Sequence, residues 1–179
     1  MKAFAFLCGA ALFATTAVQA QEPLLLVDRS SSVNAGIDFD IQLAITELGE
    51  QFIEVIPWSS HVRNTLWGRA VDLSFLLPPA HGYTNLNYAL QSLVDQIECR
   101  HVIVIVDGVA DEISGVRDPL NSLLSMNQVT VLVITQSHTV LSIYEGLSRN
   151  HNYQALLLEP GVLSSVYNSS SGDCVVHLG

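Results

Sequence analysis

Positive charge is scarce in this sequence. It has one lysine, Lys2, and six arginines against seventeen aspartates and glutamates, so its formal net charge is −10 at pH 7 with histidine neutral. Nucleic acids and anionic membrane surfaces attract basic proteins, so we expect neither as a partner. A site for a bound cation is compatible with this charge balance.

Long hydrophobic runs are missing beyond the N-terminus. There, Met1-Lys2 precedes an apolar run from Ala3 to Ala14, and Val18-Gln19-Ala20 follows. This pattern predicts a signal peptide over residues 1–20 that is cleaved after Ala20. The run is shorter than the roughly 20 apolar residues that cross a bilayer. We therefore expect an exported protein, periplasmic or secreted, with no membrane span and a single domain at residues 21–179.

Cysteine is also rare. Of the three cysteines, Cys8 lies in the predicted signal peptide, which leaves Cys99 and Cys174. An even number of cysteines in an exported chain favours one disulfide between them. The alternative is a pair of buried thiols. A metal site built from two cysteines without a C-x-x-C spacing is not favoured.

Short apolar runs alternate with amphipathic segments, which is typical of parallel strands joined by helices. The run His101 to Val106, HVIVIV, is almost wholly apolar and β-branched, as expected of a strand covered on both faces. Leu66 to Leu76 alternates polar and apolar residues, which predicts an extended antiparallel segment at the sheet edge. We expect strands at 24–27, 51–58, 101–106, 129–135 and 154–158, and helices at 36–50, 85–98, 118–126 and 140–149.

The segment 163–179 gives no clear assignment. The predicted fold class is α/β, a three-layer α/β/α sandwich with a mostly parallel central sheet and an antiparallel edge strand. In such sheets the ligand site lies at the carboxyl ends of the strands. The residues that directly follow each strand are therefore the candidates for function.

Oxygen-bearing side chains gather at these strand ends. Asp28-Arg29-Ser30-Ser31-Ser32 follows the first strand, Thr84 precedes the central helix, and Asp107 follows HVIVIV. Residues two apart in an extended turn point the same way, so Asp28, Ser30 and Ser32 can converge. Carboxylates and hydroxyls are hard donors that select Mg²⁺, Mn²⁺ or Ca²⁺ over zinc or copper.

These motifs resemble the metal-ion-dependent adhesion site (MIDAS) of the von Willebrand factor type A (vWA) domain. The matching pieces are D-x-S-x-S after the first strand, a threonine in G-x-T-x-L-x-x-A-L, and Asp-Gly after an apolar strand. They occur in the right order and span nearly all of residues 21–179. The length, the leader and Cys99 before the central strand are also similar to small exported bacterial proteins of this type.

The resemblance implies a Rossmann-like fold and a role for each site residue. Ser30 and Ser32 would coordinate a divalent cation directly, and Asp28 directly or through water. Thr84 would coordinate in the ligand-engaged state, and Asp107 through water. Mg²⁺ would be the first choice of ion, with Mn²⁺ or Ca²⁺ as alternatives. A carboxylate from a protein partner would complete the coordination, so the resemblance implies a non-enzymatic binding module.

One residue departs from the motif, because Ser31 stands where the family usually has glycine. A turn that needed a positive φ at this position would strain a serine. A simpler interpretation of the serines is that they cap the helix that follows. Capping does not explain why Thr84 and Asp107 also occur at the positions that the motif requires. Asp111 and Glu112, just beyond, are interpreted as solvated acids.

Two other functions are considered. The protein could be an envelope scaffold with the same fold and a vestigial metal site. It could also be a metal-dependent phosphate-ester hydrolase with Asp28 as nucleophile. A phosphotransferase of the haloacid-dehalogenase type would need a second aspartate where Ser30 stands, and no G-x-S-x-G elbow for a serine hydrolase occurs. Catalysis is therefore disfavoured.

Overall fold

The computed structural model describes residues 22–135 and 137–170. The predicted signal peptide and Cys174 lie outside these residues, so the cleavage after Ala20 and the Cys99–Cys174 disulfide stay predictions. Cys99 itself lies just before a central strand, with φ 58°.

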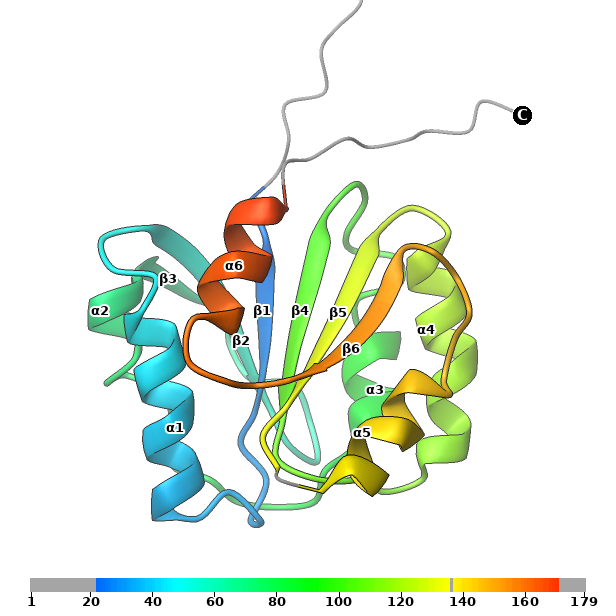
Figure 1. Cartoon of the computed structure of the whole chain (residues 1–179), viewed down its shortest axis with the longest axis horizontal. Helices are drawn as coiled ribbons and strands as arrows, with labels where there is room; N and C mark the ends of the chain where they lie inside the picture. The colour runs from blue at the N-terminus through cyan, green and yellow to red at the C-terminus, as the bar shows by residue number, and fades with distance from the viewer. Residues whose placement is uncertain (1–21, 136, 171–179) are drawn as a thin grey trace, which may run out of the picture.

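A six-stranded sheet forms the middle layer of the described residues, in the order β3-β2-β1-β4-β5-β6 (Figure 1). All neighbouring pairs are parallel except β2 and the edge strand β3, which are antiparallel. This confirms the predicted α/β class with its antiparallel edge. The strands are β1 (Leu24–Asp28), β2 (Phe52–Trp58), β3 (Leu66–Arg69), β4 (His101–Val106), β5 (Gln128–Val133) and β6 (Tyr153–Leu157).

Helices cover both faces of the sheet and create two cores. The helices are α1 (Ala35–Thr46), α2 (Ala70–Leu73), α3 (Leu86–Gln91), α4 (Arg117–Leu124), α5 (His138–Glu145) and α6 (Val162–Ser169), with a 3-10 turn η1 (Ile113–Val116). Leu24 and Leu26 of β1 point into the core under α3, α4 and α5. Leu25 and Val27 point into the core under α1, α2 and α6. Successive side chains of one strand therefore contribute to both cores in turn, as expected when each face of the sheet is covered.

The helices predicted at 36–50 and 85–98 are shorter than expected and end at Thr46 and Gln91. Two other segments differ from the sequence expectation in kind. The extended segment predicted from Leu66 to Leu76 ends at Arg69 and continues as α2. Arg69 pairs with Phe52, the first residue of β2, so the chain beyond it has no strand to pair with. The tail that gave no assignment contains α6, which begins after Gly161 at φ 80°.

The strand order places the candidate residues together. The chain leaves β1 toward β2 on one side, and it leaves β4 toward β5 on the other, so the switch in strand order lies between β1 and β4. Asp28 and Asp107 stand at the carboxyl ends of these two neighbouring strands. Among the described residues, none of the helices has the length and apolar character needed to cross a membrane.

Candidate metal centre

The loop after β1 turns alternate side chains toward one point. Asp28 is fully buried, and its Oδ1 accepts a hydrogen bond from the backbone N–H of Ser30 at 2.8 Å. The hydroxyl oxygens of Ser30 and Ser32 lie 2.8 Å apart. The intervening Arg29 points elsewhere, where its guanidinium contacts Asp38 and donates to the carbonyl of Pro78. The predicted convergence of Ser30 and Ser32 is thus present in the structure.

Ser31 fits its position without backbone strain. Among the described residues other than glycine, only Cys99 and Glu112 have a positive φ. Ser31 is exposed, and its N–H donates to the carbonyl of Gly82 at 2.9 Å. The absence of glycine between the two serines therefore leaves the loop intact.

Thr84 is brought to the serines by its own loop. Its Oγ1 donates to Ser30 Oγ at 2.9 Å, and both residues are buried. The two loops are also joined through backbone atoms, since the N–H of His81 donates to the carbonyl of Arg29 at 2.8 Å. Gly82, between His81 and Thr84, has φ 82°. Hydroxyls separated by more than fifty positions in sequence thus form one chain of contacts.

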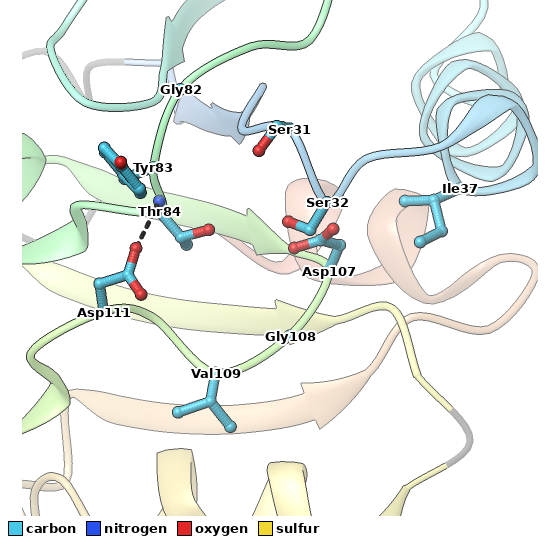
Figure 2. Close-up of a pocket in the computed structure, with 10 residues that line it drawn as sticks. All are labelled: Ser31, Ser32, Ile37, Gly82, Tyr83, Thr84, Asp107, Gly108, Val109 and Asp111. Carbon is cyan, nitrogen blue, oxygen red and sulfur yellow. Dashed lines mark hydrogen bonds between the residues drawn. The ribbon is translucent and has the colours of Figure 1, made fainter.

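The loop after β4 adds Asp107 and is fixed by Asp111. The N–H of Thr84 donates to Asp111 Oδ2 at 3.0 Å, and the N–H of Asp111 donates back to the carbonyl of Thr84 at 2.9 Å (Figure 2). Asp111 was expected to be a solvated acid, and it is exposed. It nevertheless holds the threonine in place, which sequence spacing gave no means to detect.

A second fixing point of this loop comes from α5. The hydroxyl of Tyr144 donates to the carbonyl of Gly108 at 2.8 Å and accepts from the N–H of Ala110 at 3.2 Å. Tyr144 is fully buried, and burial raises the pKa of its hydroxyl, so the group remains a neutral donor. Nothing in the sequence around Tyr144 distinguishes it from a core aromatic residue.

The three loops surround an open pocket of about 470 Å³. Figure 2 shows the side-chain oxygens of Ser32, Thr84 and Asp107 facing the same space. Ile37, Tyr83 and Val109 form its apolar rim, and Tyr83 is 76% exposed. The pocket therefore has hard oxygen donors inside and apolar contact surface at the edge.

Each of the two carboxylates of the site has one oxygen without a hydrogen-bond partner. Asp28 Oδ2 and Asp107 Oδ1 are buried and have no hydrogen-bond partner. Burial raises the pKa of Asp28 to about 7, and the nearby charge of Asp107 adds to this, although the bond from the Ser30 N–H opposes it. A buried acceptor without a partner is costly, and a cation would satisfy both oxygens.

The donor set suits one class of metal. Among the described residues, no three or more His, Cys, Asp or Glu side chains are grouped so that they could hold a metal ion. A cation here would therefore depend on the hydroxyls of Ser30, Ser32 and Thr84 together with the two carboxylates. Hydroxyl and carboxylate oxygens fit Mg²⁺, Mn²⁺ or Ca²⁺ rather than a soft metal.

Solved structures share this arrangement of strands and helices. A von Willebrand factor type A protein from Catenulispora acidiphila matches 84% of this chain and 42% of its own, with a TM-score of 0.58 and 14% identity. The chain has a vWA-like fold. An aerotolerance-related membrane protein from Bacteroides fragilis matches 84% of the chain and 98% of its own, with a TM-score of 0.60 and 14% identity.

A third structure of similar fold is loaded with a metal ion. The manganese-loaded TRAP protein of Plasmodium vivax matches 78% of this chain and 70% of its own, with a TM-score of 0.53 and 18% identity. This chain spans less than half the length of the Catenulispora protein. No family model and no curated protein matches the sequence. At these identities the likeness shows the fold, which confirms the three-layer architecture expected from the sequence.

Proposed function

We propose that this vWA-like domain is a non-enzymatic binding module that holds one divalent cation at its pocket. The ligands would be Asp28, Ser30, Ser32, Thr84 and Asp107. One observation carries the proposal: two buried carboxylate oxygens, Asp28 Oδ2 and Asp107 Oδ1, have no partner beside a chain of three hydroxyls.

Mg²⁺ is the ion that we expect first. It prefers six near-octahedral oxygens and keeps several waters, so a site with a few protein oxygens and an open side suits it. Mn²⁺ or Ca²⁺ could take the same donors. The manganese-loaded TRAP structure supports a divalent ion in this fold, without identifying the ion that binds here.

The open side of the pocket would receive the partner. A bound cation is the largest local charge in a site and attracts an oxygen anion. A carboxylate of a protein partner would take an open coordination position, and the exposed Tyr83 and Val109 would contact its neighbouring residues. The cation thus gives an acidic protein a local point of attraction for an acidic side chain.

The predicted signal peptide supports a location outside the cytoplasm. We propose that residues 21–179 act as one domain in the periplasm or after secretion. The partner would then be an envelope or extracellular protein.

A pull-down tests metal and partner together. Immobilised residues 21–179 would be incubated with envelope extract of the source organism in Mg²⁺, in EDTA, and in EDTA followed by excess Mg²⁺. We expect a protein retained in Mg²⁺, lost in EDTA and regained on adding Mg²⁺. Retention that is insensitive to EDTA would contradict the proposal.

Two variants test whether retention in the pull-down depends on the proposed metal ligands. The double variant Asp28→Ala, Thr84→Ala removes two ligands and should abolish retention. Thr46→Ala is the control, because it removes a threonine hydroxyl that bonds only Gln42 on α1. Wild-type retention by the double variant would indicate a scaffold with a vestigial site. Turnover of a phosphate ester that Asp28→Asn abolishes would indicate an enzyme instead.

A further inference from the structure

Three arginines have no acidic partner among the described residues of this strongly acidic protein. Three of the six arginines form ion pairs, namely Arg29 with Asp38, Arg69 with Glu50 and Asp72, and Arg100 with Glu54. Within the described part of the chain, the other three, Arg63, Arg117 and Arg149, have no carboxylate within ion-pair distance. Arg63 instead contacts the His81 ring and donates to the carbonyl of Pro79. Arg117 and Arg149 line the same pocket, of about 390 Å³.

The pocket lies between α4 and residues 146–149, which directly follow α5. Arg117 is held there because its guanidinium donates to the carbonyl of Gly146 at 3.0 Å. This bond uses one of the five N–H donors of the guanidinium and leaves the others for a ligand. Asn121 and Ser148 add an amide and a hydroxyl to the same lining. The lining therefore offers donors of positive or neutral charge and no carboxylate.

An apolar pocket adjoins this one. It has a volume of about 290 Å³ and shares Arg117 and Leu147 with the first pocket. Ile113, Ser114 and Ile143 complete its lining. The two pockets together form a groove, which we call the α4/α5 groove, with a cationic half and an aliphatic half.

We propose that the α4/α5 groove binds a small amphiphilic anion. A carboxylate or phosphate head would lie between Arg117 and Arg149, since a guanidinium binds either oxyanion through paired N–H donors. A short aliphatic chain would lie against Ile113, Ile143 and Leu147, where burying each methylene group favours binding. The overall negative charge repels anions, so binding here would depend on the two guanidinium groups of the groove.

The groove is distinct from the metal centre. It is lined by α4, η1, Ile143 of α5 and the segment 146–149 after α5, whereas the metal pocket is lined mainly by the loops at the carboxyl edge of the sheet. No residue is common to the two linings. The proposal therefore does not depend on a bound cation and can be tested in EDTA.

Three probes test the groove by NMR chemical-shift titration of residues 21–179 at low ionic strength: inorganic phosphate, hexyl phosphate and hexanoate. We expect saturable shifts at the groove with both amphiphiles. Hexyl phosphate should bind at least about tenfold more tightly than inorganic phosphate, because its chain reaches the aliphatic half. The tighter of the two amphiphiles identifies the head group.

Single variants separate the groove from general charge effects. Arg149→Gln should weaken binding of hexyl phosphate about tenfold, and it leaves the fold intact because Arg149 makes no hydrogen bond or ion pair in the described structure. Arg69→Gln, which removes the same charge at the opposite edge of the sheet, should leave binding unchanged. Unaltered affinity in Arg149→Gln overturns the proposal. Equal affinity for hexyl phosphate and inorganic phosphate, or the absence of saturable shifts, overturns it as well.

Discussion

At the scale of single residues, Gly82 determines how closely the threonine loop approaches the serine loop. Its φ is 82°, in the region that glycine adopts without strain. A Cβ at this position would lie 2.2 Å from Ser60 Oγ, closer than two non-bonded atoms can approach. Its carbonyl also accepts the N–H of Ser31. The loop that carries Thr84 therefore needs glycine at this point.

Gly82→Ala is expected to destabilise the protein. Both the positive φ and the contact with Ser60 oppose a side chain, so we expect the free energy of unfolding to fall by about 1–3 kcal/mol. Gly108→Ala is the matched control, since a Cβ there meets nothing within 4 Å and its φ is not positive. Its effect should stay within about 0.5 kcal/mol. Urea unfolding followed by circular dichroism compares the two, and equal effects would contradict this account.

At the scale of elements, α5 holds the loop that carries Asp107. The Tyr144 hydroxyl bridges the Gly108 carbonyl and the Ala110 N–H, so helix and loop are linked through one buried side chain. Two hydrogen bonds between Thr84 and Asp111 then join this loop to the threonine loop. The site depends on an element that contributes none of its proposed ligands.

Tyr144→Phe tests this link. The variant keeps the buried ring but leaves two backbone groups of the loop unpaired, at a cost of about 1–3 kcal/mol. We expect metal affinity to fall several-fold. Tyr153→Phe is the control, because its hydroxyl donates to the carbonyl of Tyr144 at 2.7 Å and touches no site loop. Calorimetric titration with Mn²⁺ measures both, and an equal loss in both variants would show that the effect is general destabilisation.

A second link between elements involves a buried histidine. His101 of β4 has its Nε2 2.7 Å from Thr130 Oγ1 on β5, and its Nδ1 contacts the hydroxyl of Ser170 at the end of α6. Burial lowers the pKa of His101 from 6.5 to about 4. The folded state therefore resists protonation of this ring, whereas the unfolded state accepts it.

This lowered pKa predicts a loss of stability in mild acid. The unfolded chain binds a proton at His101 below pH 6.5 and the folded chain only near pH 4, so stability falls as pH decreases across this window. The loss from this residue is on the order of 3 kcal/mol. Chemical unfolding at both ends of the window measures it. His101→Gln should remove this component, whereas His138→Gln, at an exposed position, should retain it; the same pH dependence in all three proteins would contradict the assignment.

The elements also show which parts of the structure could be predicted from the sequence. β4 was predicted with the bounds that it has in the structure because HVIVIV is almost wholly apolar and β-branched, as expected of a strand covered on both faces. α6 was not predicted, since Ser and Asn are weak helix formers and its start at Gly161 lacks a side-chain cap. At the site, alternate spacing indicated Ser30 and Ser32. Asp111 was not identified, because its bonds go to the backbone of Thr84 and depend only on tertiary structure.

At the scale of the whole molecule, the sheet topology gathers negative charge at the carboxyl edge of the sheet. The strand order brings Asp28 and Asp107 to neighbouring strand ends, although β1 ends at Asp28 and β4 begins only at His101. The protein as a whole carries a net charge of −10, so two neighbouring carboxylates, each with one buried oxygen that lacks a partner, add to an existing excess of negative charge. A divalent cation would relieve both the local and the overall imbalance.

The central claim is that the pocket binds one divalent cation through its hydroxyls as well as its carboxylates. Titration of Mn²⁺ into residues 21–179, followed by the electron paramagnetic resonance signal of the free ion, tests it most directly. The account predicts one bound ion per chain, an affinity at least about tenfold weaker in Thr84→Val, and near wild-type affinity in Thr84→Ser, which keeps the hydroxyl. No saturable loss of the free Mn²⁺ signal, or equal affinity in Thr84→Val and wild type, would contradict it.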